Sequence, residues 1–346
     1  MKEAPITALV ILNYNGRKFL EQFLPGVVQY SPKESLLVVG DNASTDDSVD
    51  FLKKTYPQIN CIVLDKNYGF AEGYNQVLKQ VTADYYFLLN SDVELKSSWQ
   101  PLIDALNINP GVVAAQPKIL SYYQPDHFEH AGAAGGWMDA LGYPFCIGRI
   151  LNHTEEDHHQ YDQSVQLFWC SGAAMIVRSK AFHDLGGFDG DYFAHMEEID
   201  WCWRAKQCGW SVISVPMVAV YHIGGGTLPY HSENKIFLNF RNNLATLFKN
   251  EPVIPLLYKI PFRMVLDLVA AISFLFRNNV KGSKAVIKAY IQFIRWLPQL
   301  IRKRKKIKAI ATGKTFNNLG LYRGSILVEY FIKGHKTFQS IRTAHE

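Results

Sequence analysis

The stretch Asn90-Ser91-Asp92-Val93-Glu94 places oxygen-bearing side chains at alternate positions. In an extended chain alternate side chains point the same way, so Asn90, Asp92 and Glu94 would form one oxygen-rich face. A carboxylate beside neutral oxygens suits a hard divalent cation, Mg²⁺ or Mn²⁺, which could hold a diphosphate and neutralise its charge. The alternative is an ordinary turn that binds nothing.

The acids Glu197, Glu198 and Asp200 open a segment with the spacing of a helix. A helix N-terminus stabilises the ionised form of carboxylates in its first turn. An ionised carboxylate in a cleft could remove the proton of a hydroxyl group as that hydroxyl attacks a carbon atom. We also expect Asp200 to pair with Arg204 on the same helix face. The alternative is that these acids only suit the helix dipole.

Two polar stretches follow apolar runs and could hold a nucleotide. Asp41 comes directly after one run, where its carboxylate could accept hydrogen bonds from a nucleoside, whereas Ser44 could simply cap a helix. Residues 67–75 follow the next run, and two glycines there would let the backbone approach a phosphate or a base. Taken alone, a glycine-bearing turn of this kind is more often structural.

Four apolar runs must position these clusters, and they recur every 24 to 28 residues. Their composition predicts buried parallel strands at 8–12, 36–39, 61–64 and 85–89. Segments of helical period lie between them, at 17–30, 46–55 and 70–81. This alternation predicts an α/β fold with a doubly wound, mostly parallel sheet, in which the polar strand ends meet at the edge where ligands bind.

The pattern changes along the rest of the chain. Apolar stretches at 112–115, 167–177 and 212–221 predict that the same sheet continues with mixed strand directions. Helical spacing dominates later, at 232–249, 256–277 and 281–308, and Pro298 could kink the last segment. We therefore predict an α/β domain at 1–250, which carries the clusters, and a basic, amphipathic helical region at 251–346.

The net charge of +5 is unevenly distributed. Residues 268–328 hold thirteen Lys or Arg and no Asp or Glu, which leaves about −8 on the rest of the chain. A basic region with apolar stretches favours helices that lie on an anionic membrane surface, and no nucleic-acid-binding module accompanies it. The longest apolar stretch, 268–276, is too short to span a bilayer, and a solvated basic helix is the alternative.

Two features predict a cytoplasmic protein. The five cysteines form no CxxC pair, which favours a reducing compartment. The apolar stretch near the start of the sequence is too short for a signal peptide. With the basic helices, these features predict a peripheral protein at the inner face of the cytoplasmic membrane.

In this order the motifs resemble those of the family 2 glycosyltransferases with the GT-A fold, especially the rhamnosyltransferase-like bacterial branch. The resemblance spans about residues 5–245. It implies inverting transfer of a sugar from a nucleotide diphosphate donor to a hydroxyl of a glycan or lipid-linked acceptor, in the synthesis of a cell-surface polysaccharide or glycolipid. The family's metal motif, usually DxD, is here Asn90-Ser91-Asp92, so its first acid is an amide.

The resemblance also implies a role for each matched residue. Glu198 would be the base, with Glu197 and Asp200 as alternatives, and Asp92 and His222 would hold a divalent cation. The residues that would contact the nucleotide sugar are Asn13, Asn15, Asp41, Asn42, Ser44, Asn67, Gly69, Phe70, Gly73, Asn75, Asn90 and Ser91. Trp169, Ser171 and Gly172 would shape the acceptor side, with the Trp169 ring facing a sugar. The glycines of 224–226, after His222, suggest a loop that closes over a ligand.

Two other classes of protein stay open. A sugar nucleotidyltransferase would share the sheet, but it needs a glycine-rich, basic loop after the first strand, where this chain has Asn13-Tyr14-Asn15-Gly16. A non-catalytic nucleotide-sugar-binding scaffold would fit the amide at Asn90 and the glutamate at Glu198, where the family has an aspartate.

Overall fold

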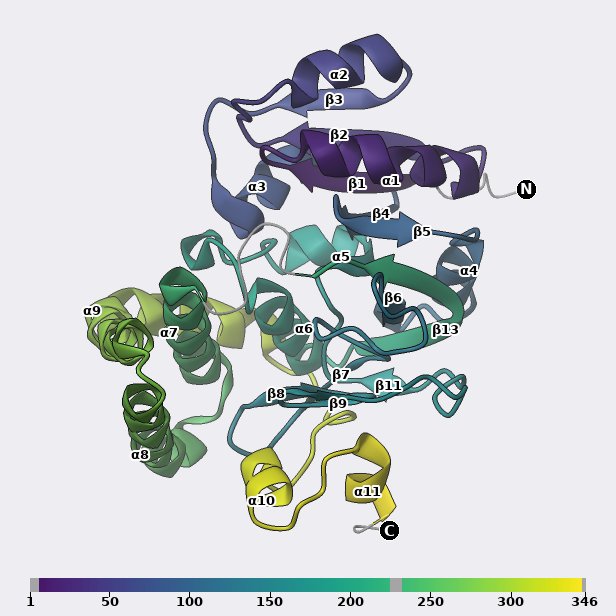
Figure 1. The fold of residues 1–346 in the computed structure, drawn as a ribbon. Helices are drawn as coiled ribbons and strands as arrows, with labels where there is room; N and C mark the ends of the chain where they lie inside the picture. Colours follow the sequence, from purple (N-terminus) through teal and green to yellow (C-terminus); the bar gives the residue numbers. More distant parts are fainter. Residues whose placement is uncertain (1–5, 225–231, 344–346) are drawn as a thin grey trace.

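The computed structural model describes residues 6–224 and 232–343. Within these residues nine strands form one sheet, in the order β11-β13-β6-β12-β4-β1-β2-β3 with β5 paired to β13 (Figure 1). Its strands are β1 (Thr7–Asn13), β2 (Leu36–Asp41), β3 (Asn60–Val63), β4 (Tyr85–Asn90), β5 (Val93–Leu95), β6 (Val112–Ser121), β11 (Gln166–Leu167), β12 (Ala174–Arg178) and β13 (Ser211–His222).

The predicted α/β fold with a mixed, mostly parallel sheet is confirmed. β1 pairs in parallel with β2 and β4, and β2 pairs in parallel with β3, so the carboxyl ends of the four predicted strands share one edge. β12 runs antiparallel to β4 and β6. The apolar stretch 167–177, which was expected as one unit, is two strands, β11 and β12, joined by a turn.

Helices cover both faces of the sheet, which explains why β1 and β4 are apolar along most of their length. Leu9 and Ile11 of β1 pack with α1 (Arg17–Tyr30), α2 (Ser48–Thr55) and α4 (Gln100–Ile108). Ala8 and Val10 point to the other face, toward α3 (Gly69–Leu78), α5 (Ser179–Asp184) and α6 (Glu197–Gln207). The short 3-10 helix η1 (Gly190–Tyr192) precedes α6.

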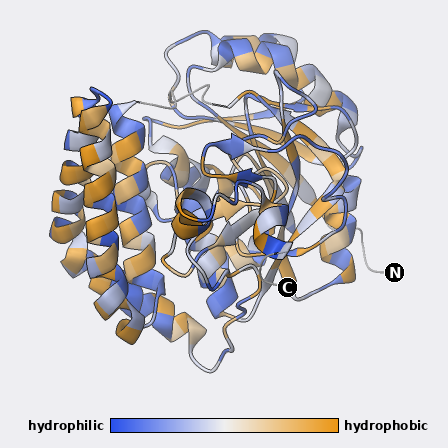
Figure 2. Ribbon diagram, turned by 60° about the horizontal axis from the view of Figure 1, so that its bottom comes forward, coloured by the Kyte–Doolittle hydropathy of each residue, from blue (hydrophilic) through white to orange (hydrophobic). Residues whose placement is uncertain are grey.

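The predicted C-terminal helical region consists of two different parts. Its two long helices, α8 (Val253–Phe276) and α9 (Val280–Ala311), form a bundle beside the sheet with α7 (Glu233–Asn250), which precedes the predicted region (Figures 1 and 2). Residues beyond α9 instead form an extended tail with two short helices, α10 (Ile326–Phe331) and α11 (Phe338–Thr343). None of the helices in the described part of the chain is long and apolar enough to cross a bilayer.

The tail packs against a second, small sheet. That sheet holds β7 (Gly136–Met138), β8 (Pro144–Cys146), β9 (Arg149–Ile150) and β10 (His153–Thr154). Met138 exchanges backbone hydrogen bonds with the tail, because its N–H donates to Gly320 at 3.1 Å and its carbonyl accepts from Tyr322 at 2.7 Å. The tail also reaches α6, where the Asn317 backbone N–H donates to the Lys206 carbonyl at 2.9 Å and the Asn317 side chain accepts from Lys206 Nζ at 3.4 Å. Gly320 lies against the backbone of Leu167 in β11.

Gly320 gives a test of how tightly the tail is docked. Its φ is +81°, and an added Cβ would lie 2.6 Å from the carbonyl carbon of Leu167. Gly334 has a similar φ of +74°, but nothing lies within 4 Å of an added Cβ. Both Gly→Ala variants should lose about 1–2 kcal/mol to the left-handed backbone, and Gly320→Ala should lose about 1–3 kcal/mol more to the clash.

The free energy of unfolding of the two variants, measured by denaturant titration, checks this. Equal losses at Gly320 and Gly334 would mean that the tail can leave β11 without consequence for the rest of the fold.

Candidate active site

The ends of β1 and β2 meet in a network of buried polar groups. Asp41 is fully buried, and its carboxylate accepts hydrogen bonds from Asn13 Nδ2 at 2.9 Å and from the Ser44 backbone N–H at 2.8 Å. Ser44 Oγ in turn accepts from the Asn15 backbone N–H at 2.8 Å. Asn13 Oδ1 is buried and has no hydrogen-bond partner among the described residues, so it can still accept one. Ser91 Oγ lies nearby, facing Gly16.

Asn42 joins this network to the turn before α3. Its amide donates to Asn67 Oδ1 at 3.1 Å and to the Gly69 carbonyl at 2.9 Å, and its oxygen accepts from the Tyr68 backbone N–H. Gly69 has a φ of +74°, and an added Cβ would lie 2.5 Å from the Phe193 ring. A glycine is therefore required here by both the backbone and the close approach of Phe193. Gly73 is required for packing, because its Cβ would lie 2.8 Å from Leu12.

The loop that precedes α6 is bonded directly to this turn. The backbone N–H groups of Phe70 and Ala71, in the first turn of α3, both donate to the Phe193 carbonyl, at 2.6 and 3.1 Å. An added Cβ at Gly172 would lie 3.3 Å from the Phe70 ring and 3.9 Å from Glu198 Cβ. A short chain of contacts thus runs from Asp41 to Glu198, and the two acids belong to one region of the protein.

Glu197 and Glu198 begin α6 with carboxyl groups that are poorly solvated. Each has an Oε2 atom without a hydrogen-bond partner among the described residues. Burial raises the pKa of Glu198 to about 7, although the backbone N–H groups of residues 172, 198 and 199 act in the opposite direction. Burial, followed by the neighbouring Glu198, raises the pKa of Glu197 well above its usual range. A carboxyl group whose pKa is raised toward neutral pH is suited to the exchange of protons.

Asp200 is unsuited to the same role, which corrects its assignment as an alternative base. It is fully buried and accepts from Arg204 Nε at 3.0 Å, Lys249 Nζ at 2.9 Å and Asn250 Nδ2 at 2.8 Å. The predicted pair with Arg204 is therefore present. Two cations and an amide occupy the carboxylate, so Asp200 holds elements together and has no oxygen left for a substrate proton.

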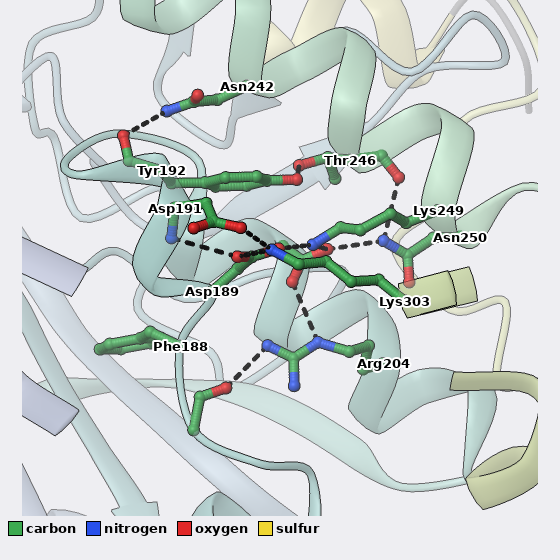
Figure 3. Close-up of polar contacts among 12 residues, drawn as sticks. Phe188, Asp189, Asp191, Tyr192, Arg204, Asn242, Thr246, Lys249, Asn250 and Lys303 are labelled. Carbon is green, nitrogen blue, oxygen red and sulfur yellow. Dashed lines mark hydrogen bonds and ion pairs between the residues drawn. The ribbon is translucent and has the colours of Figure 1, made fainter. Parts of the chain in front are cut away.

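The same network fixes the segment that leads into α6. Asp189 accepts from Lys249 of α7 at 2.5 Å and from Lys303 of α9, and Lys303 also bonds to Asp191 at 2.5 Å (Figure 3). Burial opposes the charge of Asp189, but the two lysines lower its pKa below the usual range. The Asn242 side chain of α7 donates to the carbonyls of residues 192, 194 and 195. Helices α7 and α9 therefore shape the loop that presents Glu198.

Asp92 and His222 face each other at the other side of the site. Asp92 Oδ1 lies 3.2 Å from His222 Nε2, and both side chains are buried. Glu129, in the loop after β6, lies 3.1 Å from His222 Nδ1. Although burial opposes the charge, hydrogen bonds and ion pairs with Asp92 and Glu129 raise the pKa of His222 to about 10. Residues 225–227, which include part of the predicted closing loop, lie outside the described residues.

This donor set fits a divalent cation. Adjacent ligands of an octahedral ion held at about 2.1 Å lie about 3 Å apart, which is close to the observed Asp92–His222 spacing of 3.2 Å. A carboxylate and an imidazole also suit Mn²⁺. The other possible cluster, Asp157, His159 and Asp162, is mostly exposed, and Lys118 already bonds to both of its aspartates.

Three residues that were predicted to contact the donor or the acceptor are instead used in packing and hydrogen bonding within the protein. Trp169 is buried, and its indole N–H donates to the Trp137 carbonyl at 2.9 Å, so its ring cannot face an acceptor sugar. Ser171 is buried, and its hydroxyl donates to the Ala131 carbonyl. The Asn75 amide forms two hydrogen bonds of 2.9 Å with the Phe188 backbone, which docks α3 on the segment before η1. Gly172 alone of the predicted acceptor residues lies beside Glu198.

Sequence reasoning missed the contributions of Glu129, Asn242, Lys249 and Lys303. Asn242 and Lys249 lie on the inner side of an amphipathic helix, where buried polar residues among apolar ones were a detectable signal. Glu129 lies in an irregular loop, where the sequence has no periodic pattern that could have indicated its burial.

Comparisons with known proteins identify the family and the fold of the chain. The sequence model described as "Glycosyl transferase family 2" matches residues 8–186, about half of the chain. The chain is 26% identical over 237 residues to an N-acetylglucosaminyl-diphospho-decaprenol L-rhamnosyltransferase of Mycobacterium tuberculosis, covering 63% of this chain and 76% of the relative. It is 34% identical over 107 residues, 30% of this chain and 38% of the relative, to the rhamnosyltransferase WbbL of Escherichia coli.

Two solved structures share the fold at 14% sequence identity. The mannosyltransferase PcManGT from Pyrobaculum calidifontis, in complex with GDP-Man and Mn²⁺, has a TM-score of 0.51 and covers 90% of this chain and 86% of its own. GalNAc-T7 with UDP, GalNAc and Mn²⁺ has a TM-score of 0.54 and covers 71% of this chain and 48% of its own. With the family match over half of its length, the chain belongs to glycosyl transferase family 2 and is a glycosyltransferase.

Proposed function

We propose that the chain transfers a sugar from a nucleoside diphosphate to a hydroxyl of a lipid-linked glycan, by a single displacement that inverts the anomeric carbon. The observation that carries this proposal is the carboxyl group of Glu198. It is poorly solvated, has a free oxygen, and lies beside Gly172 and Phe70, next to the turn that bonds to Asn42. A base in this place can serve an acceptor that attacks a sugar held above the carboxyl ends of β1, β2 and β4.

The buried network at the ends of β1 and β2 is the proposed nucleoside site. Asn13 offers an unused carbonyl oxygen, and Asp41 holds the Asn13 amide in place. Asn90, the last residue of β4, and Ser91, which follows it, lie beside this network and complete the proposed donor side. Two relatives are named rhamnosyltransferases, so nucleoside diphosphate-rhamnose is the first donor to test.

Asp92 and His222 are the proposed ligands of a divalent cation. When bound, such an ion would neutralise the negative charge that gathers on the departing diphosphate. Two structures with this fold contain Mn²⁺, which supports the same assignment here. The carboxylate of Asp92 and the Nε2 atom of His222 would orient the diphosphate through that ion.

Glu198 accepts the proton of the acceptor hydroxyl in this mechanism. The hydroxyl oxygen forms a bond to the anomeric carbon on the face opposite the diphosphate, while the bond from that carbon to the diphosphate oxygen breaks. The proton passes to Glu198 and the bonding electron pair leaves with the diphosphate. One displacement inverts the configuration, and no covalent sugar–enzyme intermediate is formed.

We expect Glu198→Gln to lower kcat by about 10²–10⁴-fold without weakening nucleotide binding. Only ionised Glu198 can take a proton, so the wild-type rate should rise with pH up to about 7 and then level off, following its raised pKa. The checks are a pH–rate profile and nucleotide titration by calorimetry. Asp200→Asn serves as a contrast, because it should reduce stability more than it changes the pH profile. Full turnover by Glu198→Gln would remove the residue from this role.

The hydrogen bonds and ion pairs made by α7 and α9 should affect kcat, because they hold the loop that precedes Glu198 in position. Lys303→Met removes the contacts with Asp189 and Asp191 but leaves Lys249 on Asp189. We expect kcat to fall about tenfold, since small displacements of a catalytic group are costly, while donor KM changes little. Lys308→Met, an exposed lysine in the last turn of the same helix, is the matched control. Steady-state assays with a water-soluble acceptor compare the two, and identical kinetics would contradict a positioning role.

The outer side of α8 and α9 is the proposed membrane-binding surface. Large apolar side chains are exposed along α8, among them Leu257, Val265 and Val269 at 73%, 59% and 59%. Figure 2 shows how much of this bundle is hydrophobic. The exposed cations of α9 and of the turn before it are Arg277, Lys281, Lys284, Lys288, Arg295 and Arg302. Apolar side chains flanked by lysine and arginine fit the interface of an anionic bilayer, where each cation contributes about 1 kcal/mol.

A membrane location would also suit the proposed acceptor. The M. tuberculosis relative is named for an acceptor linked through a diphosphate to decaprenol. A lipid-linked acceptor of that kind would lie at the bilayer surface, within reach of an enzyme docked there. The five cysteines are free thiols, which supports the inner, reducing side of the cytoplasmic membrane.

Sedimentation with lipid vesicles tests this surface. The protein should bind vesicles that contain phosphatidylglycerol, less so at high salt, and bind weakly to pure phosphatidylcholine. The double variant Leu257→Glu, Val265→Glu should lose most binding. Its control is Ile108→Glu, Met217→Glu, which alters exposed apolar side chains of α4 and β13. Unchanged vesicle binding by the α8 variant, or self-association of the wild type through α8, would contradict the proposal.

A further inference from the structure

A buried carboxylate outside the predicted site contacts His222. Glu129 lies in the loop between β6 and β7 and is only 4% exposed. Its Oε2 atom is 3.1 Å from His222 Nδ1 and also accepts the Ala131 backbone N–H at 2.5 Å. The Glu129 backbone N–H donates to the Ile119 carbonyl of β6 at 3.0 Å. These bonds fix the position of the carboxylate relative to the sheet.

His222 is thereby held from both sides. Its Nδ1 atom faces Glu129, and its Nε2 atom faces Asp92 at 3.2 Å. A neutral imidazole carries its single N–H on one nitrogen, and a carboxylate next to one nitrogen selects the form in which that nitrogen donates. Without a metal ion, the two carboxylates favour the imidazolium form, in which Nε2–H faces Asp92 and Nδ1–H faces Glu129. A divalent cation would take the place of the Nε2 proton, and Glu129 would keep the remaining N–H on Nδ1, so that the Nε2 lone pair faces the ion beside Asp92.

Charge balance gives Glu129 a second effect on the same site. The metal motif has the amide of Asn90 in place of its first acid, so Asp92 is its single carboxylate. Glu129 adds a second carboxylate from a different part of the chain. A divalent cation near Asp92 and a neutral His222 would then meet two negative charges. Lys235 of α7 also interacts with Glu129, so the charge of Glu129 is partly balanced without an ion.

We propose that Glu129 is a positioning residue that orients His222, so that Nε2 and the Asp92 carboxylate bind one divalent cation together. The proposal rests on the metal assignment made for the proposed function. It assigns Glu129 no contact with the ion or with a substrate. Partners of this kind, a carboxylate behind a histidine ligand, typically contribute 10- to 100-fold to metal affinity.

Mn²⁺ binding to the full-length protein tests this without any assay of transfer. Free Mn²⁺ is measured by EPR during titration, once with Mn²⁺ alone and once with UDP present. Glu129→Ala should weaken Mn²⁺ binding about 10- to 100-fold. Glu129→Gln keeps an oxygen that can accept the Nδ1–H, so we expect a smaller loss, and this variant also preserves the contact with Ala131. Asp126→Asn, an exposed acid of the same loop that bonds to His127, is the matched control and should bind Mn²⁺ like the wild type.

A spectroscopic measurement distinguishes a change in the orientation of His222 from a general loss of structure. The pulsed EPR spectrum of bound Mn²⁺ should contain coupling to a histidine nitrogen in the wild type and in Asp126→Asn, and this coupling should weaken in Glu129→Ala. Equal Mn²⁺ affinity and equal nitrogen coupling in wild type and Glu129→Ala would overturn the role of Glu129 and leave the proposed function intact. Absence of Mn²⁺ binding by the wild type in both titrations would overturn the metal assignment and, with it, this proposal.

Discussion

The loop that presents Glu198 is held in a backbone conformation that its own residues disfavour. Phe193, His195 and Met196 all have positive φ, at 67°, 69° and 73°. For residues other than glycine this conformation costs about 1–2 kcal/mol each, and it persists only where the surroundings determine it. Here the surroundings are the Asn242 amide, which bonds three loop carbonyls, and the lysines that meet at Asp189. The position of the proposed base depends on these contacts.

The contacts that hold the loop before Glu198 come from helices later in the chain. The family match ends at residue 186, before Glu198, so the matched part of the chain does not contain the elements that hold the proposed base. Lys249 comes from α7 and Lys303 from α9, far along the sequence from the loop that they fix. The bundle that carries the proposed membrane surface is therefore also part of the support for the active site. The domain boundary predicted near residue 250 falls between α7 and α9, although lysines from both helices bond to Asp189.

The sequence predicted the sheet well because local patterns determine it. Short apolar runs that end in Asp41 and Asn90 identify buried parallel strands, and strand ends of this kind must meet at one edge. Trp169, Ser171 and Asp200 were misassigned for a common physical reason. Whether a polar or aromatic side chain is free depends on partners that come from distant segments: the Trp137 carbonyl, the Ala131 carbonyl, and Lys249 with Asn250. The composition of a sequence and the spacing of its residues do not reveal partners that are distant along the chain.

Glu198 and Asp200 show how strongly those distant partners decide function. Both are acids in the first turn of α6, and the helix dipole favours the ionised form of each. Asp200 is buried and accepts from Arg204, Lys249 and Asn250, so each of its carboxylate oxygens already has a partner. Glu198 receives no cation from the described residues, and burial raises its pKa to about 7. The difference arises because Lys249 of α7 bonds to Asp200, whereas Glu198 lies on the side of α6 that faces Gly172.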